Sequence, residues 1–260
     1  MKNFIRIVQM FFGAAWLIFG TQHFWYADAV AKMVPEYFPA RRFWAYLVGA
    51  AMIAAGLSLI AGIKARLAAV LLGVMLLMFF LTIQVPKMIG GNWSAVNWTR
   101  IFQDFAIAAA AFMLAWILSK REEGEPDVWK KIGNASRYVF AALLIVFGIG
   151  QFFNLDFLTA KVPEYLLLRI FWVYLTGIAM IITGVSVFIN KKARTAAIAL
   201  ATFLLILNLL RYAPLFLTGA YNALLLTAAM LDLTIICGVF FLACALPQES
   251  SEVAEGDRLS

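Results

Sequence analysis

The sequence predicts an all-α polytopic membrane protein with eight transmembrane helices, arranged as two tandem four-helix bundles. The 260-residue chain is 64% hydrophobic and 13% charged, with a mean hydropathy of +0.89. Because about a quarter of a typical soluble domain is charged, this composition belongs in a bilayer. The apolar residues fall into segments long enough to cross a hydrocarbon core of about 30 Å as helices. The eight predicted spans are residues 4–24, 43–63, 67–85, 98–118, 136–153, 171–189, 195–212 and 224–246.

An internal repeat predicts the two bundles. The motif Val-Pro-Glu-Tyr at residues 34–37 returns at residues 162–165, an offset of 128. Across residues 34–56, 14 of 23 positions are identical at this offset, and the matches include Pro, Glu, Arg and Trp. A shared apolar composition does not produce such matches, so the chain reads as a tandem duplication. Each copy has an even number of spans, which predicts parallel halves related by an axis along the membrane normal.

The repeat also sets the predicted boundaries. Residues 1–118 form the first repeat and residues 136–247 the second, separated by a polar cytoplasmic linker at 119–135. Residues 248–260, rich in Ser and Glu, have the composition of a disordered acidic tail.

Basic residues predict the orientation. Thirteen of the 21 Lys and Arg residues fall at the termini and at the junctions that we assign to the cytoplasm. Both termini are therefore expected in the cytoplasm, with the protein in the inner membrane. The net charge of +7 follows from this topology and gives no support to nucleic-acid binding.

Three further groups of residues can be interpreted from their chemistry. Residues 25–42 carry aromatic and charged side chains, and Pro35 and Pro39 break a continuous helix, which favours a short re-entrant or interfacial piece. In the second span, Gly49 and Gly56 belong to a small-residue surface that lets membrane helices approach closely. Cys237 and Cys244 are read as small apolar core residues.

Acidic residues inside predicted spans are the strongest functional signal. An ionised carboxylate in hydrocarbon is costly unless it is paired or wetted. Asp104 lies about 10 Å from the outer end of the fourth span, and Arg100 precedes it by one helical turn. Its counterpart Asp232 has Ala228 at the position of Arg100, so Arg211 is its nearest expected counter-charge. Either the carboxylates lock their helices, or they serve a site.

The first half is the more polar copy, so a site is expected there. The candidate ligand-binding residues are His23, Glu36, Arg41, Arg42, Gln84, Arg100, Gln103 and Asp104, expected to converge at the outer end. Their second-half counterparts are Glu164, Arg169, Arg211 and Asp232. The alternative interpretation makes Glu36 and Glu164 salt-bridge partners of Arg41 and Arg169 in the connectors. No residue is assigned a catalytic role.

Metal and haem chemistry find little support in the sequence. His23 is the single histidine, which excludes bis-histidine haem and histidine-rich metal sites. Nucleotide-binding loops, zinc-protease motifs and nucleophile elbows are also absent from the sequence.

Several features together resemble the DoxX-like family of small bacterial membrane proteins. They are a Gly20-x-x-His23 end to the first helix, Val34-Pro35 in the connector, glycines 49 and 56, and Arg100-x-x-x-Asp104. The family's typical member is a single four-helix unit, so the resemblance implies a covalent pseudo-dimer. It also implies similarity to the membrane subunit of thiosulfate:quinone oxidoreductase.

Three functions follow as expectations. The leading one is a quinone-interacting or redox-associated subunit, with His23, Arg100 and Asp104 at the polar end of the ligand. Phe24, Trp25 and Trp98 would then enclose its ring, and electron transfer would need a redox partner protein. The second is a non-enzymatic binder or carrier of a lipophilic small molecule, and the third is a structural or assembly protein.

Overall fold

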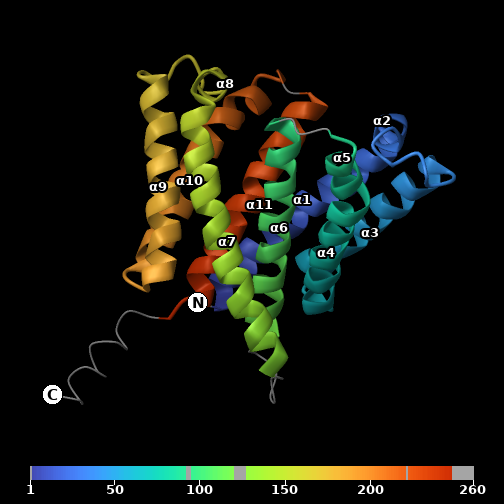
Figure 1. Ribbon diagram of the computed structural model, residues 1–260, viewed down its shortest axis with the longest axis horizontal. Helices are drawn as coiled ribbons and strands as arrows, with labels where there is room; N and C mark the ends of the chain where they lie inside the picture. The colour runs from blue at the N-terminus through green and yellow to red at the C-terminus, as the bar shows by residue number, and fades with distance from the viewer. Residues whose placement is uncertain (1, 92–94, 120–126, 221, 248–260) are drawn as a thin grey trace.

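The computed structural model describes residues 2–91, 95–119, 127–220 and 222–247, and these are entirely helical or irregular (Figure 1). Eight helices are long and apolar enough to cross a membrane, which confirms the predicted fold class of a multi-pass all-α protein. The elements in chain order are α1 Lys2–Trp25, α2 Ala27–Ala31, α3 Arg41–Ala61, α4 Ala65–Phe79, η1 Phe80–Gln84, α5 Val85–Ile89, α6 Ala95–Ser119, α7 Asp127–Phe153, α8 Leu155–Thr159, α9 Arg169–Ile189, α10 Ala193–Leu217 and α11 Ala223–Ala245.

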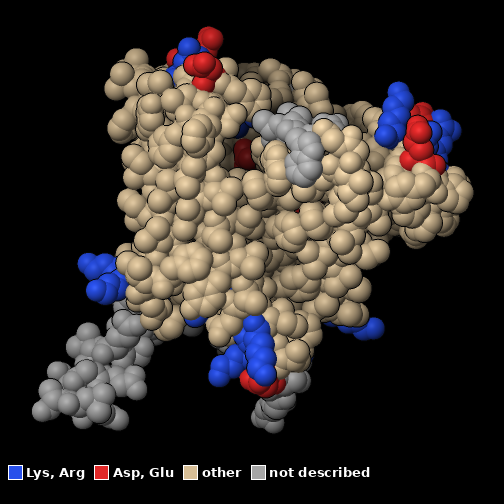
Figure 2. All heavy atoms as spheres, in the orientation of Figure 1, with Lys and Arg blue, Asp and Glu red and all other residues tan. Residues whose placement is uncertain are grey.

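Charged side chains lie at the two ends of the molecule, with a broad apolar face between them (Figure 2). We call the end where α1 and α7 begin the basic end, and the opposite end, with α2 and α8, the connector end. Because α1 and α7 begin at the same end, they run in the same direction (Figure 1). Many large apolar side chains on the face between the ends are exposed, including Phe11 at 55% and Leu71 at 56%. A lipid bilayer is the environment that covers such a surface.

The end of the predicted linker differs from the structure. α7 begins at Asp127, so residues 127–135 of the predicted linker are helical. Asp127 is favourable beside the positive end of the helix dipole and pairs with Lys131, one turn later, at 2.8 Å. Residues 120–126 and the predicted tail 248–260 lie outside the described residues.

Two spans also continue past their prolines. The prediction ended the third span at residue 85 and the seventh at residue 212, but the helices extend to Ile89 and Leu217. Pro86 follows a single π-helical stretch, η1, in which the backbone N–H of Val85 bonds to the carbonyl of Phe80. Such a bulge accommodates the proline ring, which would otherwise meet the preceding turn.

The two halves share helices. α1 packs against α3 of its own half and against α11 of the second half. In the same way α7 packs against α9 and against α6, while α6 and α11 pack against each other. Each half's first helix is therefore covered by the other half's last helix as well as by its own half.

The contact between α6 and α11 places equivalent positions face to face. Gly238 is the counterpart of Ala110 at the offset of 128. A Cβ atom added to Gly238 would lie 2.9 Å from the Cβ of Ala110 and 2.7 Å from the ring of Phe140. Only glycine fits there, and the self-contact is what a two-fold axis between the halves would produce.

Glycines bring α1 and α3 into backbone contact. A Cβ atom on Gly20 would lie 2.7 Å from the carbonyl oxygen of Gly49, and one on Gly56 would lie 2.7 Å from that of Gly13. The predicted small-residue surface is thus confirmed at Gly49 and Gly56. In the second half a Cβ atom on Gly148 would lie 2.6 Å from the carbonyl oxygen of Gly177.

The tyrosine of the repeated motif bonds to a carbonyl that a proline leaves unpaired. Proline has no N–H, so Pro214 cannot donate to the carbonyl of Leu210 one turn earlier in α10. The hydroxyl of Tyr165 donates to that carbonyl instead. The first half repeats the contact, since Tyr37 donates to the carbonyl of Thr82, four residues before Pro86. Each connector is thereby tied to the span that carries the helix proline.

This pairing predicts a double-mutant result. Tyr165→Phe should lower the free energy of unfolding in detergent by about 1 kcal/mol, because the Leu210 carbonyl loses its donor. In a Pro214→Ala background the new N–H can bond to Leu210, so the same Tyr165→Phe change should cost little. Equal costs in the two backgrounds, measured by thermal unfolding, would contradict this account.

Candidate functional site

Each half holds its intramembrane carboxylate by a donor from the preceding span. Gln84 Nε2 lies 3.4 Å from an oxygen of Asp104, and the Tyr212 hydroxyl donates to Asp232 over 3.0 Å. Gln84 and Tyr212 are counterparts at the offset of 128. The position of the donor is therefore kept while its chemistry differs, and the tyrosine bond is the shorter.

The Asp232 carboxylate faces two cations. Arg211 Nη1 lies 3.6 Å from it, which confirms Arg211 as its counter-charge. Lys161, in the connector between α8 and α9, interacts electrostatically with both Arg211 and Asp232. Burial and the Arg211 guanidinium lower the pKa of Lys161, and Asp232 partly opposes them. The Lys161 ammonium also lies 3.8 Å from the ring centre of Phe157. Two cations facing one carboxylate leave this cluster with a net positive charge.

Asp104 does not form the direct contact with Arg100 that one of the two interpretations of the sequence expected. Within the described part of the chain, no ion pair within 4.0 Å joins it to Arg100, and its hydrogen bond comes from Gln84 instead. Arg100 and Lys87 act on Asp104 electrostatically without direct contact.

A hollow opens near the connector end, between α6 and α7, with acidic atoms at its floor (Figure 2). Figure 1 shows these two helices diverging towards that end, with α11 behind them. The Asp232 side chain leaves 46% of its surface accessible and Arg211 leaves 28%, although both lie within predicted membrane spans. The carboxylate is thus surrounded by protein yet reachable from outside.

Buried polar atoms without a hydrogen-bond partner occur on α10 and at the end of α8. The amide nitrogen of Asn208, one turn before Tyr212, is buried and has no hydrogen-bond partner among the described residues. The hydroxyl of Thr159 is likewise buried and without a partner there. The first-half counterpart of Asn208 is Phe80, whose ring packs 4.6 Å from that of Phe105. At this one position the second half is therefore the more polar.

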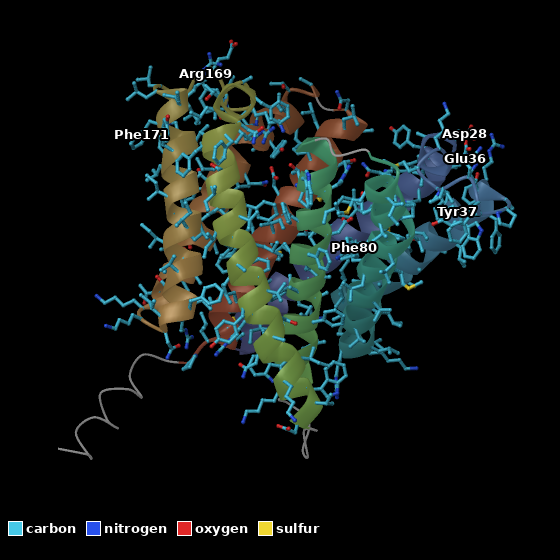
Figure 3. All side chains as sticks on the ribbon, in the orientation of Figure 1. Asp28, Glu36, Tyr37, Phe80, Arg169 and Phe171 are labelled. Atoms are coloured by element: carbon cyan, nitrogen blue, oxygen red, sulfur yellow. The ribbon has the colours of Figure 1, made fainter. Side chains whose placement is uncertain are left out.

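The predicted first-half residues do not form one cluster. Asp28 and Glu36 lie at the far edge of the connector end, away from Phe80, which packs against Phe105 beside Asp104 in the chain (Figure 3). There Arg41 pairs with Glu36 at 3.9 Å, as the alternative interpretation expected, and Arg42 pairs with Asp28. These are exposed ion pairs, which contribute little to stability.

The remaining candidates lie apart from one another. His23 packs against α3 at Gly49, and its Nδ1 lies 2.7 Å from the carbonyl oxygen of Phe19. Gln103 is half-buried on α6, next to Asp104 in the chain. No ion pair joins Glu164 to Arg169 within the described residues.

The rings predicted to enclose a ligand are largely exposed. Trp25 is 74% accessible and Phe24 is 42% accessible, with the Phe24 ring 5.4 Å from that of Tyr46. Trp98 is 36% accessible and stacks on Phe102.

Sequence reasoning gave Lys161 and Tyr212 no role in a site. The signal was the comparison of the halves, because Met33 stands at the position of Lys161 and Gln84 at that of Tyr212. In the described ranges no group of three or more His, Cys, Asp or Glu residues is placed to hold a metal ion.

Comparison with known families gives one match. A family model described as a domain of unknown function, DUF8561, matches residues 12–120. No curated protein and no solved structure matches the chain. The match covers most of the first half and ends next to the polar segment that follows α6.

The carboxylate contact can be tested by exchanging its donor. Tyr212→Phe should lower the free energy of unfolding by about 1 kcal/mol, because Asp232 loses a hydrogen bond. Tyr212→Gln, which installs the first-half donor, should recover part of this loss. Thermal unfolding in detergent measures both, and a Phe variant as stable as the wild type would show that the bond contributes nothing.

Proposed function

We propose that the protein binds a lipophilic molecule with an electron-rich oxygen head, of the quinone class, in the hollow beside Asp232. The observation that carries this proposal is the accessibility of the site. A carboxylate within a membrane span keeps 46% of its side-chain surface accessible while contacting both Tyr212 and Arg211. Intramembrane ionisable residues that face a cavity are functional sites more often than not.

The charge of the cluster determines the kind of head group. Lys161 and Arg211 together outweigh Asp232, so the site favours electron-rich oxygen, such as a quinone carbonyl. The cations and the buried amide of Asn208 can donate hydrogen bonds to such an oxygen. The carboxylate can accept a hydrogen bond from a hydroxyl, which is the form that the reduced head carries.

The position of the hollow supports entry from the bilayer. It opens on the side of the molecule, between α6 and α7, on the face with few charged residues (Figure 2). A lipophilic tail can remain among the exposed apolar side chains while the head reaches Asp232. Access of this kind suits a ligand that is dissolved in the membrane.

The broader setting belongs to the same proposal. The repeated motif and the contacts that recur 128 residues apart support a tandem duplication. The bias in basic residues supports an inner-membrane protein with both termini in the cytoplasm. With redox chemistry at the site, electrons would come from a partner protein, as the DoxX-like resemblance implies.

Two alternatives use the same residues. A non-enzymatic carrier would bind the lipophile without chemistry at Asp232. A structural role is favoured by the matching contacts of Gln84 with Asp104 and of Tyr212 with Asp232, which tie neighbouring spans together in both halves.

Ligand analysis with a matched pair of variants tests the proposal. The protein is purified in mild detergent, and bound small molecules are identified by mass spectrometry in the wild type, Asp232→Asn and Asp104→Asn. We expect a near-stoichiometric quinone in the wild type and in Asp104→Asn. Asp232→Asn should bind added ubiquinone-1 about tenfold more weakly, a loss of about 1.4 kcal/mol.

The outcomes separate the alternatives. A different lipophile lost only in Asp232→Asn would favour the carrier. An empty wild type that fails to bind ubiquinone-1, with both variants destabilised alike, would overturn the proposal in favour of the structural role.

A further inference from the structure

A cavity lies at the basic end, away from the connector end near which the hollow of Figure 2 opens. It is a groove of about 520 Å³ between the start of α1, the start of α10 and the end of α11. Its lining is apolar except for one cation and one hydroxyl, and consists of Phe4, Arg194, Ile198, Thr202, Phe240, Ala243 and Cys244. An apolar channel with a cation at its mouth matches the two chemical parts of a phospholipid.

The equivalent surface of the first half has bulkier side chains. Arg66 is the counterpart of Arg194, and Trp116 is the counterpart of Cys244. The Trp116 ring packs so closely on α7 that a Cβ atom on Gly133 would lie 2.1 Å from it. Trp129, from the start of α7, places its ring 4.7 Å from the Arg66 guanidinium carbon.

One difference between the halves lies directly at the groove. Cys244 replaces an indole ring with a small side chain, so it lines the groove and is only partly buried, while Cys237 is buried. Gly133, on which the Trp116 ring packs, has the buried Ile5 as its counterpart in α1. The groove is thus bordered by a small side chain at the end of α11, where the first half has an indole ring.

The charge at the groove mouth selects the occupant. Lys191 and Lys192 lie beside Arg194 where α10 begins, and both are exposed. Clustered basic residues at a membrane surface attract anionic lipids, at about 1 kcal/mol for each residue. Cations that snorkel to the interface place their charge at the depth of the phosphate group.

We propose that this groove binds one acyl chain of an anionic phospholipid, with the phosphate beside Arg194. The chain would lie beside Cys244, at the position that Trp116 has in the first half. The site is independent of the proposed quinone site, because the two lie at opposite ends of the molecule.

Native mass spectrometry with defined lipids tests the proposal. The full-length protein is exchanged into mild detergent containing equal amounts of phosphatidylglycerol and phosphatidylcholine, and retained lipids are counted. We expect one retained phosphatidylglycerol in the wild type. Cys244→Trp, which installs the first-half side chain, should lower its occupancy by about tenfold, equivalent to 1.4 kcal/mol.

Two arginine variants form a matched control. Arg194→Gln should bring retention of the two lipids close to parity, whereas Arg66→Gln, at the counterpart position, should leave the preference unchanged. Cys244→Ala keeps the groove open and should retain lipid like the wild type. This control shows whether the loss in Cys244→Trp comes from filling the groove or from removing the thiol. Retention that is insensitive to Cys244→Trp in a variant with an unchanged melting temperature would overturn the proposal. Equal responses to Arg194→Gln and Arg66→Gln would also overturn it.

Discussion

The packing of α6 against α11 is the constraint on which the other helices depend. These two helices lie between the halves, and each also covers the first helix of the opposite half. Close approach requires small residues, and Gly238 against Ala110 supplies them at equivalent positions. In a membrane, close packing of this kind replaces the hydrophobic effect as a source of helix association. Because α6 carries Asp104 and α11 carries Asp232, the same contact places both carboxylates near the centre of the protein.

The two halves share the same helix contacts and differ in side chains at particular positions. Donor positions, motif tyrosines and helix prolines recur at the offset of 128, so the geometry around each carboxylate is retained. Side chains at other positions differ, with Asn208 at the position of Phe80 and Cys244 at that of Trp116. Both changes replace a ring with a smaller group in the second half. Cys244 lines the groove at the basic end.

Much of the fold was readable from the sequence because hydrocarbon length and apolar runs set the spans directly. The ion pair of Arg211 with Asp232 was also predictable, since a carboxylate in a span needs a counter-charge and Arg211 was the nearest one. The sharing of α6 and α11 between halves was not predictable. A repeat fixes the contents of each copy, whereas the choice between packing within a copy and across copies depends on tertiary contacts.

Local energetics explain the remaining differences. The linker appeared too polar for a helix, yet Asp127 and Lys131 stabilise its first turn and Trp129 packs on the protein. Proline looked like the end of a span, but a tyrosine from the connector satisfies the carbonyl that the proline leaves free. The expected first-half site assumed that polar residues converge. Instead Glu36 lies on the connector, and Arg41 and Arg42 lie at the start of α3, where they form exposed ion pairs.

Site-directed cross-linking measures the sharing of helices between halves most directly. The side chain of Gln22 on α1 accepts a hydrogen bond from Thr227 on α11 at 3.0 Å, and the first-half counterpart of Thr227 is Thr99. In a Cys237→Ala, Cys244→Ala background, Gln22→Cys is combined with either Thr227→Cys or Thr99→Cys and oxidised in membranes. We predict a disulfide between positions 22 and 227 and none between 22 and 99. The opposite pattern would show that each half closes on itself.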